Sequence, residues 1–99
     1  MDLGIDNLNK AFESRIRLGI MSILMVNENA DFRRLKELLN VTDGNLASHI
    51  SALEKAGYII ITKQFIGKKP KTAYSATRSG KNAFKAHLDN LEKLIKRNR

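Results

Sequence analysis

Residues 32–57, with the sequence FRRLKELLNVTDGNLASHISALEKAG, contain the pattern that decides the fold of this 99-residue chain. Two apolar series at helical spacing predict two α-helices joined by a tight turn. Asp31 and Thr42 are placed to cap the first and the second helix, and Gly57 is placed to stop the second. The first series consists of Leu35, Leu38 and Leu39, and the second of Leu46, Ile50 and Leu53.

The face of the second helix opposite its apolar series is small and polar. Short polar side chains let a helix approach another molecule closely while offering hydrogen-bond donors and acceptors. These are the properties of a helix that reads the DNA major groove. The residues assigned to this surface are Thr42, Asp43, Gly44, Asn45, Ser48, His49, Ala52 and Lys55.

Individual residues on this face have alternative roles. Asn45 and Ser48 are candidates for contacts with base edges or phosphates, while local capping is the alternative for Asn45. For Asp43 we favour an interaction with the helix dipole over a contact with cytosine. Gly44 is unfavourable inside a helix, so its presence needs a reason. Close approach of the backbone to DNA is one explanation, and packing on the preceding helix is the alternative. For His49 a structural hydrogen bond to a backbone carbonyl of the neighbouring helix is favoured over a phosphate contact or pH sensing.

After residue 57 the pattern changes from helix to strand. Residues 58–65 (YIIITKQF) and 72–76 (TAYSA) predict two strands, with a Gly- and Pro-containing turn at 66–71. The resulting hairpin, or wing, would place its bases beside phosphates or in the minor groove. The alternative is a basic hairpin tip without a partner. The wing bases are Lys63, Lys68, Lys69 and Lys71.

The net charge of +8 is confined to one block of the chain. Residues 55–85 contain eight bases and no acid, and the other ten bases are balanced by the ten acids. A polyanionic partner explains this distribution most simply. A solvated basic surface that serves solubility is the alternative.

Helical patterns precede the helix-turn-helix. Residues 14–26 (SRIRLGIMSILMV) predict a helix that is apolar round most of its circumference, with Ser14 as its N-cap. Residues 1–12 give a looser pattern, which we interpret as a short helix that folds on a partner surface. Its apolar residues are Leu3, Ile5, Leu8 and Phe12.

A final helix is predicted over residues 78–96, with Thr77 as its cap. Its apolar residues follow a two-heptad seam that would cover the chain's own core or pair with a second copy. We favour pairing, so residues 1–26 and 78–97 are expected to form a dimer, with His87 at the interface. The predicted interface residues are Phe12, Phe84, Leu88, Leu91 and Ile95.

Other classes of function are disfavoured by composition. The chain has no Cys, and its two His lack metal-ligand spacing, so we predict no metal site and no cofactor. Neither a nucleophile–base set nor a phosphate-binding glycine loop is present, so we do not expect an enzyme. No apolar run reaches the roughly 20 residues of a membrane span, and no cleavage site follows the apolar run near the N-terminus. We therefore expect a cytoplasmic protein that does not bind membranes.

Two motifs carry a family resemblance. LKELLNVTDGNLASHISALEKAGYI at 35–59 and GKKPKTAYSATRSG at 67–80 resemble small prokaryotic winged-helix transcriptional regulators of the MarR and ArsR type. The resemblance covers roughly residues 12–95. It implies an α+β fold: a helix, a helix-turn-helix, a two-stranded β-hairpin wing and a C-terminal helix in a single 1–99 domain.

The same resemblance implies a homodimer that binds double-stranded DNA, and repression is our default expectation. A protein–protein interaction module and a sequence-tolerant architectural DNA binder are the alternatives, and the acid-free block favours DNA. The chain lacks the Cys ligands of many ArsR-type sensors and is shorter than larger MarR-type regulators. Whether it binds a small-molecule effector is therefore left open.

Overall fold

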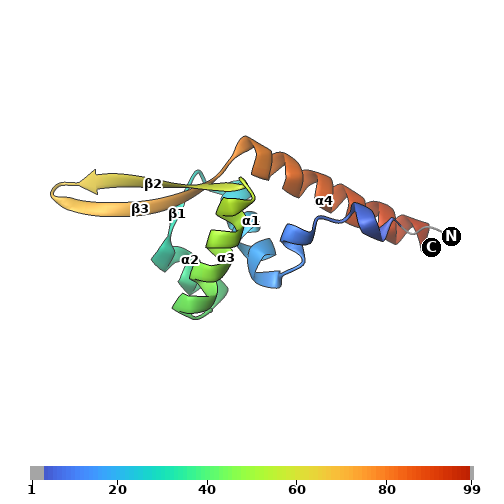
Figure 1. The fold of residues 1–99 in the computed structure, drawn as a ribbon, viewed down its shortest axis with the longest axis horizontal. Helices are drawn as coiled ribbons and strands as arrows, with labels where there is room; N and C mark the ends of the chain where they lie inside the picture. Colours follow the sequence, from blue (N-terminus) through green and yellow to red (C-terminus); the bar gives the residue numbers. More distant parts are fainter. Residues whose placement is uncertain (1–3, 99) are drawn as a thin grey trace.

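The computed structural model describes residues 4–98, so the prediction for Leu3 lies outside the described residues. The described part begins with two short 3-10 helices, followed by four α-helices and three β-strands (Figure 1). In order, the elements are η1 (Ile5–Asn7), η2 (Lys10–Phe12), α1 (Arg15–Val26), β1 (Ala30–Asp31), α2 (Phe32–Leu39), α3 (Asp43–Lys55), β2 (Ile59–Ile66), β3 (Lys69–Ala76) and α4 (Arg78–Arg97). The α2–α3 unit is the predicted helix-turn-helix, and β2 and β3 form the predicted wing.

Every predicted N-cap is confirmed. Ser14 Oγ accepts from the backbone N–H groups of Ile16 and Arg17 at the start of α1. Asp31, Thr42 and Thr77 cap α2, α3 and α4 in the same way. These side chains satisfy backbone donors that the first turn of a helix leaves free, so the helix boundaries follow from local sequence.

The core forms where α1, α2 and α3 meet the root of the wing. Leu46, Ile50 and Leu53 of α3 are buried as predicted, against Ile20 of α1 and Leu35 of α2. The prediction for Leu38 is wrong, because this side chain is exposed. Leu35 and Leu39 lie one turn apart and face α1, whereas Leu38 projects about 60° away from Leu35 on the other side.

The sheet has a third strand that the sequence did not predict. Its order is β1-β3-β2, and β1 pairs with β3 through Ala30↔Tyr74 and Asp31↔Ala73. A two-residue strand carries no periodic signal, because alternation needs a longer run.

The wing is longer than predicted. β2 pairs with β3 from Ile59↔Ala76 to Ile66↔Lys69, which leaves only Gly67 and Lys68 in the turn. Gly67 has a φ of 66°, which permits this tight connection. Pro70 was predicted to lie in the turn, yet it pairs opposite Phe65. Proline is tolerated there because β1 does not extend that far, so only β2 flanks this part of β3.

The N-terminal segment packs on its own chain, and the single short helix predicted there is wrong. It forms η1 and η2, and the Asn9 side chain accepts from Ala11 N–H to start the second turn. The ring of Phe12 is buried, stacked on Tyr58 with centroids 5.3 Å apart and edge-on to Phe84 at the same distance.

His87 is buried beside these rings, so its predicted place at an interface is wrong. Its Nδ1 accepts from the backbone N–H of Asn9 at 3.0 Å, while the Asn9 side chain donates to the Tyr58 hydroxyl at 2.9 Å. Burial lowers the pKa of His87, and the opposing charge of Glu13 offsets only part of this effect. The neutral ring is therefore the form that the fold selects.

Gly80→Ala is expected to lower the free energy of unfolding by at least about 2 kcal/mol, because the added methyl group would overlap the Tyr58 backbone. Gly44→Ala is the matched control, since nothing lies within 4 Å of its added Cβ. The control should change stability by at most about 1 kcal/mol, in the stabilising direction. Urea unfolding followed by circular dichroism measures both, and equal stabilities would contradict the close packing at Gly80.

Acidification below pH 6.5, the ordinary pKa of a histidine side chain, is expected to destabilise the fold through His87. The pKa of His87 is lowered in the folded chain, so the unfolded chain binds the proton more readily. The contribution to stability is complete above pH 6.5 and falls as the pH drops. His87→Gln keeps an acceptor but cannot titrate. Urea unfolding at pH 7.5 and 5.5 should show a smaller pH effect for this variant, and an equal effect would exclude His87 as the source.

Candidate nucleic-acid interface

The polar face of α3 lies opposite its buried face, as predicted. Asp43, Gly44, Asn45, Ser48 and Lys55 are exposed, Ala52 is half-buried and His49 lies at the boundary. At 100° per residue, the exposed positions 45, 48 and 55 and the half-buried position 52 fall on one stripe. The structure therefore brings the predicted α3 residues together on one free surface.

The start of α3 is held by its N-cap and by a link to α2. Thr42 Oγ1 accepts from the backbone N–H of Asn45 at 3.2 Å, so the cap is Thr42 and the Asn45 side chain is not needed for it. Lys36 Nζ of α2 lies 2.8 Å from Asp43 Oδ1. Both side chains are exposed, so the pair stabilises the fold by at most about 1 kcal/mol. Its larger effect is to offset the negative charge of Asp43.

Gly44 and the neighbouring side chains leave the helix start open. A Cβ at Gly44 would have no neighbour within 4 Å, so packing on α2 does not explain this glycine. Within residues 4–98, the side chains of Asn45 and Ser48 make no hydrogen bond to another part of the chain. Their donors and acceptors are therefore free for an external partner.

His49 makes a structural hydrogen bond, as predicted, but its partner is a side chain and not the expected backbone carbonyl. Its Nδ1 accepts from Arg17 Nε at 3.0 Å, which joins α1 to the edge of the α3 surface. Burial lowers the pKa of His49, and the positive charge of Arg17 lowers it further. A phosphate contact by this ring remains a prediction.

The wing places its lysines on a hairpin that projects away from the helices (Figure 1). The side chains of Lys63, Lys68, Lys69 and Lys71 are all exposed. Lys71 Nζ lies 3.7 Å from Asp31 Oδ2, whereas the other three have no ion pair with any residue of the described chain. The hairpin follows α3 in the chain after a three-residue connection, so its root lies next to the C-terminal end of that helix.

The predicted dimer residues separate into two groups. Phe12 and Phe84 are buried in the chain's own core, which is the alternative that the sequence left open, and they do not form a free surface. Leu88 and Ile95 are exposed on α4, and Leu91 between them is half-buried. Their role in a dimer stays a prediction.

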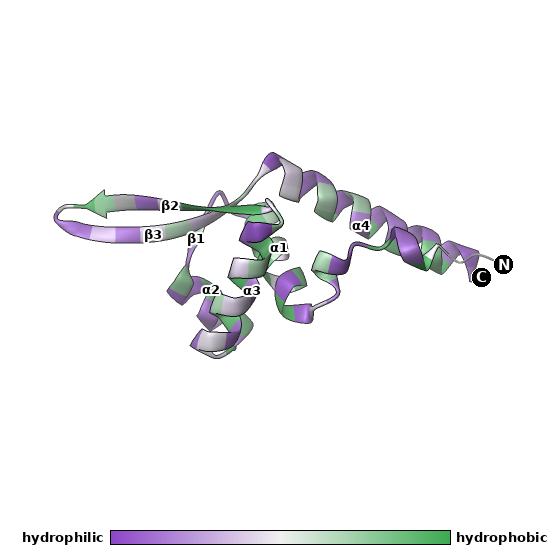
Figure 2. Cartoon of the chain, in the orientation of Figure 1, coloured by the Kyte–Doolittle hydropathy of each residue, from purple (hydrophilic) through white to green (hydrophobic). Residues whose placement is uncertain are grey.

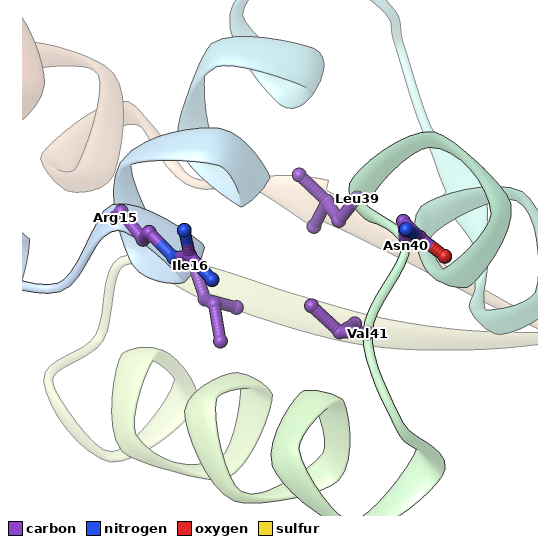
Figure 3. Close-up of a pocket in the computed structure, with 5 residues that line it drawn as sticks. All are labelled: Arg15, Ile16, Leu39, Asn40 and Val41. Atoms are coloured by element: carbon purple, nitrogen blue, oxygen red, sulfur yellow. The ribbon is translucent and has the colours of Figure 1, made fainter.

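A hollow of about 310 Å³ lies between the start of α1 and the turn that joins α2 to α3 (Figure 3). Sequence analysis did not find it, because it is formed by two segments that are distant in the chain and carry no common motif. Its wall is mixed, because aliphatic side chains lie beside polar groups, and Arg15 is its charged residue. It is lined by Arg15, Ile16, Leu39, Asn40 and Val41.

Metal and membrane sites are not indicated by the described residues. Across residues 4–98, no group of three or more His, Cys, Asp or Glu side chains is placed to hold a metal ion. None of the helices in this part of the chain is long and apolar enough to cross a membrane.

Comparisons with known proteins agree with this geometry. Residues 16–95 match the family model of the winged helix DNA-binding domain. An uncharacterized protein of Methanocaldococcus jannaschii is 38% identical over 87 residues, which span 88% of this chain and 95% of that protein.

Solved structures show the same fold. The transcriptional regulator homologue protein from Pyrococcus horikoshii OT3 is 33% identical, with a TM-score of 0.76 over 93% of this chain and 96% of that one. The YusO protein from Bacillus subtilis is 16% identical, with a TM-score of 0.80 over 96% of this chain and 67% of that one. The predicted α+β winged helix-turn-helix fold and the resemblance to winged-helix transcriptional regulators are confirmed.

Proposed function

Because this chain belongs to the winged helix DNA-binding domain family, we propose that it regulates transcription by binding a specific duplex DNA sequence as a homodimer. The observation that carries the proposal is the exposed polar face of α3 beside an acid-free, lysine-bearing wing. The family and fold are those of transcription regulators, and the chain is not an enzyme.

The α3 helix enters the major groove with its N-terminal turn foremost. Open space at Gly44 allows the backbone to approach the DNA, and Asn45 can bond both hydrogen-bonding groups of an adenine edge. Ser48, one turn further on, reaches a base or a phosphate. The positive charge of Lys36 offsets the negative charge of Asp43, so phosphates near the start of α3 are repelled less by the Asp43 carboxylate.

The wing binds the DNA backbone or the minor groove beside α3. Lys63, Lys68 and Lys69 have no acidic partner within the described chain, so their charges are available to phosphates. Such contacts fix the position of the protein and release counterions, without reading sequence directly.

A second copy pairs along the outer end of α4. Leu88, Leu91 and Ile95 keep the spacing of a coiled-coil seam, and Ile5 of the adjacent η1 is also exposed. Figure 1 shows that α4 and the N-terminal segment extend away from the wing. Pairing there leaves both α3 helices free to bind half-sites about one DNA turn, or roughly 34 Å, apart.

Repression by occupancy is the simplest mechanism for such a dimer. A regulator bound at a promoter blocks polymerase and needs no activation surface. A protein–protein docking module would not need three unpaired lysines on its wing, and an architectural binder would show little difference between specific and non-specific affinity.

Substitutions on the wing and on α3 are expected to have different effects. Lys68→Ala combined with Lys69→Ala should weaken binding to all duplexes and reduce the salt slope by about one for each phosphate that the protein no longer neutralises. Asn45→Ala should instead reduce discrimination at one base pair by about 1–3 kcal/mol. Lys93→Ala, an exposed lysine on α4, is the control.

Selection from a randomised duplex pool, at two salt concentrations, measures both effects. An enriched inverted repeat is expected for the natural chain. A uniform loss of affinity in Asn45→Ala would refute base reading by that residue, and the absence of any enriched sequence would support an architectural binder.

The dimer is expected to dissociate when charge is placed on the α4 seam. Leu88→Lys should yield monomers in sedimentation experiments at micromolar concentration, because two lysines would meet at the interface. Ile60→Lys on the wing is the matched control, since Ile60 is 49% exposed and Leu88 is 46% exposed. A natural chain that is itself monomeric without DNA would contradict the interface.

A further inference from the structure

The tip of the wing carries large apolar side chains that the fold itself does not use. Phe65 is 73% exposed and Ile66 is 62% exposed, at the end of β2 next to the Gly67–Lys68 turn. Phe65 is the least protected aromatic ring among the described residues, since the other rings lie in or against the core. Packing within the chain does not explain why an aromatic ring is exposed beside lysines.

The core of the same chain is too far away to cover Phe65. The last buried residue of β2 is Ile59, and Phe65 lies six positions further along the extended strand, or about 20 Å away. On β3, burial ends at Ala73, which pairs with Thr62, three positions or about 10 Å before Phe65. Figure 2 shows this hydrophobic end of β2 in green beside the hydrophilic start of β3, at the point of the wing farthest from the helices. Only another molecule can bury this ring.

Strand geometry places charge beside the apolar groups on both faces of the tip. Phe65 lies opposite Pro70, and Lys63 is two residues before Phe65 on the same face. Ile66 lies opposite Lys69 on the other face. The proline ring fixes the φ angle of the backbone opposite Phe65. The Lys68 side chain is exposed at the turn. The partner must therefore offer apolar area between negative charges.

A DNA minor groove has this combination, because stacked bases lie between two rows of phosphates. We propose that Phe65 is an apolar wedge that enters the minor groove and partly inserts at a base step, while Lys63 and Lys68 contact the flanking phosphates. Wedges of this kind unstack the step and bend the duplex by tens of degrees. This inference rests on the proposed function, since the wing must first be placed on DNA by α3.

The wedge adds specificity without any hydrogen bond to a base. Pyrimidine–purine steps such as TA and CA/TG unstack most easily, so a wing that inserts Phe65 prefers them at the flanks of the site. The preference would appear outside the base pairs read by Asn45. Only lysines were predicted to contact DNA from the wing, because Phe65 ends the predicted strand and its sequence does not indicate whether the ring is exposed.

The test uses the full chain, the selected duplex and Phe65→Ala, with Val26→Ala as an exposed apolar control on α1. Affinity is measured by fluorescence anisotropy over a range of salt, and bending by energy transfer between dyes at the duplex ends. Phe65→Ala should lose about tenfold in affinity and most of the bend, with the salt slope unchanged. Phe65→Trp should retain both, and the Lys68→Ala, Lys69→Ala double variant should lose salt slope instead.

Other outcomes overturn the wedge in distinguishable ways. If Phe65→Ala binds and bends the duplex as the natural chain does, the wedge is wrong and the proposed function stands. If the natural chain binds no duplex, both proposals fail. Phe65-dependent binding to anionic phosphatidylserine vesicles, with unchanged DNA affinity and bend in Phe65→Ala, would assign the tip to a lipid surface.

Discussion

The close contact between Gly80 and the Tyr58 backbone is the constraint on which the rest of the structure depends. It joins the end of α3, the root of the wing and the start of α4 at one point. Thr77 strengthens the junction, because its backbone N–H donates to Tyr58 O at 2.9 Å and its hydroxyl donates to Gly57 O at 2.7 Å. The Tyr58 ring stacks on the Phe12 ring, and this contact anchors the N-terminal segment. The direction of the wing relative to the polar face of α3 follows from this junction.

Local sequence determined the parts of the fold that local interactions control. The caps at Ser14, Asp31, Thr42 and Thr77, and the buried face of α3, were predictable because each needs only near neighbours. Features that depend on tertiary contacts were not. The β1 strand exists only because β3 is beside it, and His87 is buried because Asn9 and Phe12 of the N-terminal segment pack against it.

The same division holds for the candidate site. The residue types on α3 and the wing predicted a DNA surface, and the structure places them on exposed faces. The sequence did not predict the pairing of Lys36 with Asp43, the choice of Arg17 as the partner of His49, or the exposure of Phe65. Each of these depends on how separate elements are oriented. Periodicity identifies the face that a residue occupies, but tertiary structure decides whether another element covers that face.

Asp31 connects two elements through the two oxygens of one carboxylate. Its Oδ1 accepts from the Arg34 backbone N–H to cap α2, and its Oδ2 lies 3.7 Å from Lys71 Nζ on β3. A phosphate that draws Lys71 away leaves the carboxylate with its full charge at the N-terminus of α2, where the helix dipole favours it. The ion pair between Lys71 and Asp31 therefore couples the wing to the start of the helix-turn-helix. By linkage, a substitution that removes the Asp31 carboxylate also changes the affinity of Lys71 for its partner.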